Sequence, residues 1–143
     1  MDYVLVLVKK NRKLLFIEKN RPDWQVGKIN LVGGKVEPGE SFKDAAFREL
    51  YEESGIIAKK MIEYGSMIGD FGEIKVFLAK HITSPHDFPK TIDGEVVFFD
   101  YWEKIKENPK LLPNLKIIVP LICCTIKGWK IYNLENNSFK VDF

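Results

Sequence analysis

The sequence of 143 residues predicts one α+β domain built around a mixed β-sheet. Its length is typical of a single domain, and its 45% hydrophobic and 13% aromatic residues are enough for one sizeable core. Strand-like and helix-like runs follow one another without a regular strand–helix–strand alternation, which disfavours a doubly wound parallel sheet. We therefore expect residues 1–143 to form a single domain in which helices cover a mixed sheet.

The first part of the chain is expected to be mainly β-structure. Two β-rich runs, residues 3–10 and 11–19, meet at the polar pair Asn11–Arg12, which predicts a hairpin. Residues 20–28 carry a proline, an aspartate and a glycine and are predicted to form a loop. A short strand is then expected over residues 29–34, where it ends in two glycines.

The segment from Ser41 to Gly55 predicts an amphipathic helix. Ser41 is a candidate N-cap with Asp44 three residues later, and Gly55 is a typical helix stop. The apolar residues recur at helical spacing and are expected to face the core: Phe42, Ala45, Ala46 and Leu50.

The remainder of the chain alternates between strand-like and helix-like segments. The apolar run of residues 114–128 is long and periodic enough for a helix, which Pro120 is expected to kink. Strands are expected on both sides of this helix, at about 57–69, 73–82 and 95–101 before it and near 129–134 and 139–143 after it.

The charge balance gives no reason to expect a polymeric or membrane partner. Twenty-two Lys and Arg against 20 Asp and Glu give a net charge of +2, which is too weak a field to indicate binding of a nucleic-acid polymer or an anionic membrane. No segment approaches the ~20 apolar residues needed to span a bilayer. The N-terminus carries an acid where a signal peptide has a basic region. A cytoplasmic location is expected.

Cys123 and Cys124 are the two cysteines of the chain, and they are adjacent. Adjacent cysteines rarely form a disulfide because the geometry is strained. They lie in an apolar run, so we expect them to fill the core as free thiols in a reducing compartment. Metal ligands or a redox pair are the alternative reading.

Glu49, Glu52 and Glu53 are three acids on one side of the predicted helix, because residues three and four apart share a face. Three such charges are destabilising unless cations lie among them. Mg²⁺ prefers oxygen ligands and is often completed by substrate phosphates, so it is the natural cation. Arg48 lies next to these acids, and we assign it a structural and electrostatic role. A solvated acidic face is the alternative interpretation.

Glycines before the helix favour the metal interpretation. Gly33 and Gly34 allow the backbone to approach a ligand closely, and Gly39 permits a turn with positive φ. A loop of this kind can hold carboxylates and a main-chain carbonyl around a metal bound to phosphate. Taken alone, two glycines would indicate only a turn.

The acids and glycines together resemble the Nudix box. The pattern occupies 23 residues, with five residues between the first two fixed positions and seven before the third: Gly34, Glu40 and the run Arg48-Glu49-Leu50-Tyr51-Glu52-Glu53-Ser54-Gly55-Ile56. The order of elements around it is similar to the family's α/β/α sandwich with a mixed sheet. The resemblance therefore implies a Nudix-type fold.

The resemblance also implies an activity and a metal site. Nudix hydrolases cleave a nucleoside diphosphate linked to another group, using Mg²⁺ and in some cases Mn²⁺. Carried over by position, Glu49, Glu52 and Glu53 are the metal-binding carboxylates and Gly33 offers its carbonyl. Either Glu53 or Glu49 would accept the proton of the attacking water. Arg48 is counted with Glu49 and Glu53 among the catalytic residues that the resemblance implies.

Two residues outside the fixed positions of the box, Glu95 and Lys35, are candidate site residues, and each also has an alternative role. Family members often draw a further metal-binding acid from a distant loop, and Glu95 lies just before a predicted strand. Its alternative is a solvated turn acid. Lys35 directly follows the two glycines and is expected to contact a substrate phosphate, with a solvent-facing side chain as the alternative.

Residues outside the box are expected to determine which substrate is bound. Residues 29–41 resemble the MutT-like branch and its oxidised-purine nucleoside triphosphatases, in which an Asn at the position of Asn30 binds the base. Where those enzymes have Trp-Pro-Asp-Asp, this chain has residues 112–115, Leu-Pro-Asn-Leu, so Asn114 would offer a neutral amide. An N-cap is the alternative role for Asn114. Trp24 is a candidate for stacking on the base, with packing as its alternative.

Three functions follow from this reading. The first is Mg²⁺-dependent hydrolysis of a standard or modified nucleoside triphosphate to the monophosphate and pyrophosphate, which would sanitise or adjust a nucleotide pool. The second is hydrolysis of another diphosphate: a dinucleoside polyphosphate, ADP-ribose, a nucleotide sugar or a capped RNA end. The third is a Nudix-fold binding module without catalysis, which the intact carboxylates disfavour. The partner is a nucleotide, and the chain is expected to be a monomer or homodimer.

Overall fold

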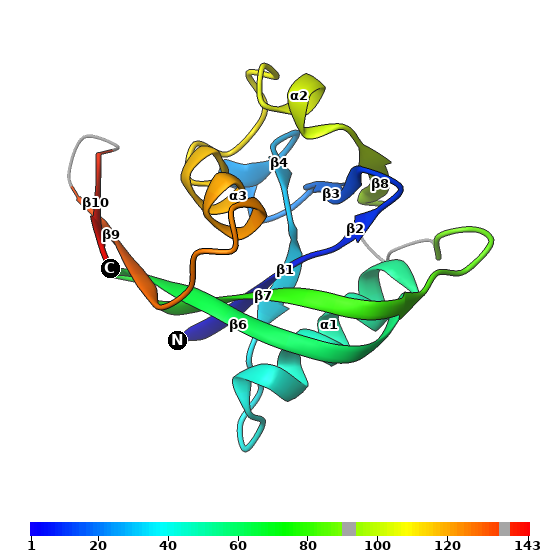
Figure 1. Cartoon of the computed structure of the whole chain (residues 1–143), viewed down its shortest axis with the longest axis horizontal. Helices are drawn as coiled ribbons and strands as arrows, with labels where there is room; N and C mark the ends of the chain where they lie inside the picture. Colours follow the sequence, from blue (N-terminus) through cyan, green and yellow to red (C-terminus); the bar gives the residue numbers. More distant parts are fainter. Residues whose placement is uncertain (90–93, 135–137) are drawn as a thin grey trace.

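The computed structural model describes residues 1–89, 94–134 and 138–143, and its main feature is a six-stranded mixed sheet (Figure 1). The strand order is β10-β9-β6-β7-β1-β5. β1 is parallel to β7 and β6 is parallel to β9, while the other neighbours are antiparallel. The six strands are β1 (Asp2–Leu7), β5 (Val32–Lys35), β6 (Ile57–Gly69), β7 (Gly72–Thr83), β9 (Trp129–Asn133) and β10 (Phe139–Asp142).

A second, smaller sheet forms around β3. β8 pairs along one edge of β3, and β2 and β4 pair with the two ends of the other edge. The predicted hairpin is confirmed: β2 and β3 are joined through Asn11 and Arg12, which have φ of 52° and 67°. The four strands are β2 (Lys9–Lys10), β3 (Lys13–Glu18), β4 (Ile29–Asn30) and β8 (Val96–Asp100).

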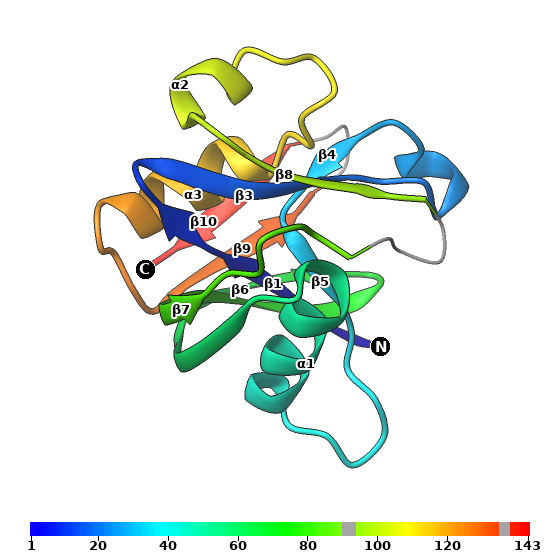
Figure 2. The same cartoon turned by 90° about the vertical axis from the view of Figure 1, so that its right-hand side faces the viewer.

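Helices α1 (Phe42–Ser54) and α3 (Leu115–Cys123) lie on opposite sides of the large sheet (Figures 1 and 2). α1 packs on a buried cluster that includes Val4 and Val6, and α3 packs on one that includes Leu5 and Leu7. Successive residues of β1 thus face opposite sides of the sheet and contribute to two cores. The predicted α/β/α sandwich with a mixed sheet is confirmed.

Local chemistry sets both ends of α1. The Ser41 hydroxyl accepts the N–H of Asp44 at 3.0 Å, and Gly55 ends the helix with φ 73°. Ala45, Ala46 and Leu50 are fully buried, as the spacing predicted. The burial of this face directs the acids of α1 away from the core and toward the turn formed by residues 33–40.

The structure differs from the sequence reading between residues 100 and 128. A short helix, α2 (Trp102–Ile105), was not predicted. Outside this range, the single 3₁₀ turn over Asp23–Gln25 in the first loop was not predicted either. α3 contains Pro120 but ends at Cys123, well before the predicted end at residue 128, because the chain turns at Thr125 with φ 58°.

The prediction that Cys123 and Cys124 fill the core is wrong, since both are exposed. The buried positions of α3 are Leu115, Ile118, Val119 and Ile122. Residues 123 and 124 follow directly after the last of these and fall outside the buried stripe of the helix. No helix in the described parts of the chain is long and apolar enough to cross a membrane.

Candidate functional site

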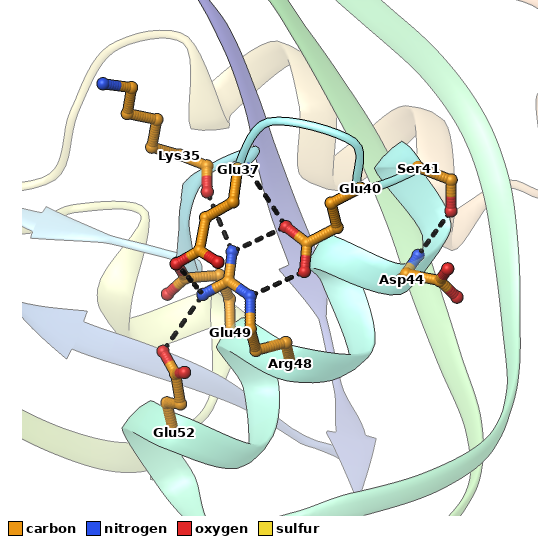
Figure 3. A network of polar contacts seen from close by, with 8 residues as sticks. All are labelled: Lys35, Glu37, Glu40, Ser41, Asp44, Arg48, Glu49 and Glu52. Atoms are coloured by element: carbon orange, nitrogen blue, oxygen red, sulfur yellow. Dashed lines mark hydrogen bonds and ion pairs between the residues drawn. The ribbon is translucent and has the colours of Figure 1, made fainter.

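Arg48 is the centre of a polar network that joins α1 to the turn before it (Figure 3). Its Nε and Nη2 donate to the two carboxylate oxygens of Glu40 at 2.7 and 2.8 Å. Its Nη1 donates to Glu49 at 2.9 Å and to Glu52 at 3.1 Å. Nη2 also donates to the main-chain carbonyl of Lys35 at 2.9 Å. One guanidinium therefore fixes the turn against the helix and balances three carboxylates.

The network also sets the charge state of Glu40. The hydrogen bond from Arg48 lowers the pKa of Glu40 to about 2, and the N–H of Glu37 adds to this effect. Glu40 is therefore ionised throughout the neutral range. The bidentate contact is the geometry for which Arg is suited and Lys is not.

Glu53 and Glu49 occupy a different environment, in which the pKa of each carboxyl is raised. Burial raises the pKa of Glu53 to about 7, while its hydrogen bond from the Gly33 N–H, at 2.8 Å, acts in the opposite direction. Burial also raises the pKa of Glu49, against the contact with Arg48. Two carboxylates of α1 are thus held in a place where their negative charge is costly.

The glycine turn lies directly against these carboxylates. A Cβ on Gly34 would be 2.5 Å from the carboxyl carbon of Glu49, and one on Gly33 would be 2.0 Å from the carbonyl oxygen of Val4. Residue 33 therefore requires glycine, because backbone atoms fill the space, and Gly34 lies directly against the Glu49 carboxylate. This is the physical reason for the glycine pair that the sequence placed before the acidic helix.

Glu95 reaches the same region from the loop before β8. Its side chain is only 5% exposed, forms an ion pair with Lys19 at 3.2 Å and accepts the N–H of Asn20 at 2.9 Å. The alternative of a solvated turn acid is therefore wrong. The charges of Glu95 and Lys19 both act on the pKa of Glu53, which places all three groups in one electrostatic site.

Lys19 was missed by the sequence reading. β3 pairs with β8 so that Glu18 lies opposite Val96, and continuing this antiparallel register by one residue brings Lys19 beside Glu95. Nothing within the local sequence around Lys19 signals this pairing, because it depends on a contact between segments far apart in the chain.

The two predicted base-reading asparagines each make one side-chain contact. Asn30 Oδ1 accepts the N–H of Leu31 at 2.8 Å, and Asn114 Nδ2 lies 3.1 Å from the sulfur of Met67. Asn114 precedes α3 but makes no side-chain capping bond, so the N-cap role is not observed.

Trp24 and Lys35 both carry exposed side chains. Trp24 is 68% exposed, so it is not a packing residue. Lys35 contributes its main-chain carbonyl to Arg48, while its side chain points away from the network (Figure 3). Each is therefore free to meet a ligand, which remains a prediction for both.

The donor chemistry of the site fits a hard divalent cation. Carboxylates from Glu49, Glu52, Glu53 and Glu95 and the carbonyl of Gly33 are oxygen ligands of the kind that Mg²⁺ prefers. A cation would also offset the cost of the buried charges. Within the described residues, no three acidic, His or Cys side chains already converge on one metal position. Glu49 and Glu52 instead face Arg48, and Glu95 faces Lys19.

The fold and the carboxylate-bearing helix define the class of protein. The structure superposes on that of the mutator MutT protein from Bacillus halodurans with a TM-score of 0.77, covering 99% of this chain and 97% of the other at 21% identity. This likeness shows a MutT-type fold. The family model for the NUDIX domain matches residues 2–120, and the chain belongs to this family.

Two relatives indicate the range of activities within the family. The chain is 35% identical over 86 residues to an oxidized purine nucleoside triphosphate hydrolase of Mus musculus, covering 56% of this chain and 54% of the other. It is 28% identical over 127 residues to a NAD-capped RNA hydrolase of Vibrio parahaemolyticus, covering 86% of this chain and 46% of the other. The chain thus spans about half the length of these relatives.

Arg48→Ala should lower both stability and activity, because it leaves Glu40 and Glu49 without their partner. We expect the free energy of unfolding to fall by about 2 kcal/mol, since the group is largely buried but not fully. Arg48→Lys is the matched control, because it keeps the charge without the bidentate fork. Its free energy of unfolding should lie between those of wild type and Arg48→Ala. Equal denaturation midpoints for all three proteins would show that Arg48 is merely solvated.

Glu53→Gln should change how stability depends on pH in the metal-free protein. The pKa of Glu53 is 4.5 unperturbed and about 7 when folded. Between these values the folded protein holds a proton that the unfolded chain has lost, so wild-type stability falls as pH rises. In EDTA at pH 8, Glu53→Gln should therefore be more stable than wild type, by at most about 3 kcal/mol. Near pH 4 the two should be equal.

Thermal or urea unfolding over pH 4–8 measures this difference. The glutamine can still accept the Gly33 N–H, so the substitution removes the charge with little change of shape. Glu107→Gln, on an exposed residue, is the control and should follow the wild-type profile. Identical profiles for wild type and Glu53→Gln would contradict the assigned environment of Glu53.

Proposed function

We propose that this protein is a Mg²⁺-dependent hydrolase that converts a nucleoside triphosphate to the nucleoside monophosphate and pyrophosphate. The observation that carries the proposal is the placement of two partly buried carboxylates, Glu49 and Glu53, against the Gly33–Gly34 turn. Such a pair beside a glycine turn suits a metal that carries a polyphosphate. Mn²⁺ is expected to substitute.

The chain's own residues have distinct tasks in this reaction. Glu49, Glu52 and Glu53, with Glu95 and the Gly33 carbonyl, would hold the cation, and Glu53 or Glu49 would accept the proton of the attacking water. The bound cation would neutralise charge on the phosphates and lower the pKa of that water. Arg48 would keep Glu49 and the turn in register as a positioning residue.

Lys19 and Lys35 supply positive charge at the two sides of the carboxylates. The ammonium of Lys19 pairs with Glu95 and favours the ionised form of Glu53. The exposed side chain of Lys35 follows the glycine turn and is positioned to meet a phosphate of the substrate. Water attack on phosphorus breaks one phosphoanhydride bond, and the pyrophosphate leaves with the electrons of that bond.

Base recognition is assigned to Asn30, Asn114 and Trp24. The hydrogen bond from Leu31 uses the Asn30 carbonyl, which leaves its amide N–H groups for a ligand. The amide of Asn114 faces Met67, which leaves its carbonyl. One donor and one acceptor can together read the edge of a base. The exposed indole of Trp24 can stack on any base.

The preference for a triphosphate is supported by the MutT-type fold and by the name of the mouse relative. A second candidate is a dinucleotide end such as that of NAD-capped RNA, because the Vibrio relative matches more of this chain. A non-catalytic binding module is less well supported, since every box carboxylate is present. We further infer a cytoplasmic protein of one domain, monomeric or homodimeric, that acts on the nucleotide pool.

A substrate panel with Mg²⁺ tests the proposal. It should contain the eight standard NTPs and dNTPs, oxidised and methylated purine triphosphates, ADP-ribose, diadenosine polyphosphates and NAD-capped RNA. We expect one triphosphate to be preferred, with equal release of monophosphate and pyrophosphate. Glu53→Gln, from the same preparation, should lose at least about 100-fold in kcat while remaining folded.

Two outcomes would contradict this assignment. Turnover of ADP-ribose, a dinucleotide or capped RNA without turnover of any triphosphate would keep the metal site and overturn the proposed substrate. Near-wild-type turnover by folded Glu53→Gln would overturn the site itself.

A further inference from the structure

A cavity of about 370 Å³ lies at the C-terminal end of α3, on the side of the large sheet opposite α1. Its apolar lining includes Leu7 of β1, Leu78 of β7 and Ile122 of α3. α3 stops at Cys123, so this end of the sheet face is not covered by helix. The proposed catalytic carboxylates belong to α1, which lies on the other side of the large sheet (Figures 1 and 2).

The cavity is separate from the proposed base-reading residues. Asn114 precedes the first residue of α3, whereas the cavity lies beyond the last turn of the helix. A nine-residue helix is about 13 Å long. The catalytic function assigned above uses no residue that lines this cavity.

Three lysines lie near the open end of this sheet face. Lys60 of β6 is directly opposite Lys80 of β7. β1 ends at Leu7, which pairs with Leu78 of β7, and Lys9 follows two residues later in β2. Lys9 and Lys80 both line the cavity. Like charges on neighbouring strands are destabilising unless an anion lies between them.

None of these three ammonium groups forms an ion pair with any residue in the ranges 1–89, 94–134 and 138–143. The cavity also contains His81, which adds a nitrogen donor or acceptor next to Lys80. Such a cluster of positive and hydrogen-bonding groups, without a protein carboxylate to balance it, is suited to an external anion.

Tyr64 adds a further polar residue to the lining of the cavity. Only 3% of its surface is exposed, and its hydroxyl has no hydrogen-bond partner among the described residues. The one fully enclosed polar side-chain atom without a partner in those residues is Oε1 of Gln25, so the Tyr64 hydroxyl is not fully enclosed. This hydroxyl is therefore available to donate a hydrogen bond to a ligand.

We propose that this cavity is a second binding site, for a small organic phosphate. The phosphate would lie against Lys9, Lys80 and the Tyr64 hydroxyl, and the apolar body of the ligand would pack on Leu7, Leu78 and Ile122. A phosphate monoester matches the site because it carries close to two negative charges and three acceptor oxygens. The lysines act as point charges that bind phosphate without a fixed bidentate geometry.

Phenyl phosphate is the probe, and ¹H–¹⁵N NMR of the whole chain in EDTA is the measurement. EDTA keeps the acidic site on α1 free of metal, so that this site repels the anion. We expect saturable amide shifts confined to the segments that line the cavity, at residues 7–9, 64, 78–82 and 122–125. Lys9→Ala combined with Lys80→Ala should weaken binding at least about tenfold. Tyr64→Phe, which removes only the hydroxyl, should weaken binding a few fold.

Lys43→Ala combined with Lys130→Ala is the matched control, since it removes two exposed lysines outside the cavity. This double variant should retain the wild-type Kd for phenyl phosphate. The absence of saturable shifts, or an unchanged Kd in both the Lys9/Lys80 double variant and Tyr64→Phe, would overturn the proposal. Because the measurement uses neither metal nor nucleotide, its result is independent of the proposed hydrolase activity.

Discussion

The contact between Arg48 and Glu40 is the interaction on which the site depends. α1 begins at Phe42, so Glu40 precedes the helix while Arg48 lies within it. Two hydrogen bonds of 2.7 and 2.8 Å between them fold the glycine-rich turn back onto the helix. The same guanidinium reaches Glu49, whose carboxylate lies against Gly34 of the turn. Sheet, turn and helix therefore meet through one side chain.

The balance of charge around this contact is uneven, and the imbalance has a chemical consequence. The hydrogen bonds from Arg48 lower the pKa of Glu40, whereas burial raises the pKa of Glu49 and of Glu53. Lys19 balances the charge of Glu95 through an ion pair. The protein thus keeps carboxylates in a costly position where the fold alone would favour neutral groups. That arrangement is consistent with a bound cation as the missing partner.

Much of the fold and the core of the site followed from local sequence signals. Ser41, Gly55 and the apolar spacing between them fixed α1, and the hairpin followed from a polar pair between two β-rich runs. The acids of α1 could be placed together because helical geometry depends only on spacing. The glycine pair at residues 33 and 34 predicted a close approach of the backbone to a ligand.

Other features depend on contacts between distant segments and could not be read locally. The pairing of Lys19 with Glu95 needs the register of β3 and β8, and the end of α3 depends on the turn at Thr125. Apolar neighbours suggested that Cys123 and Cys124 were buried, but the phase of the helix decides which residues face the core. The pair of Lys60 and Lys80 appears only once β6 and β7 are placed side by side, and Lys9 of β2 meets Lys80 only in the lining of the cavity.

The most direct test of the central claim is a titration of Mn²⁺ binding by electron paramagnetic resonance. It compares wild type with the double variant Glu49→Gln, Glu53→Gln, without any nucleotide. If these two buried carboxylates hold the metal, the double variant should bind Mn²⁺ at least about tenfold more weakly while keeping the wild-type fold. Equal affinity in the two folded proteins would contradict the account and place the metal elsewhere.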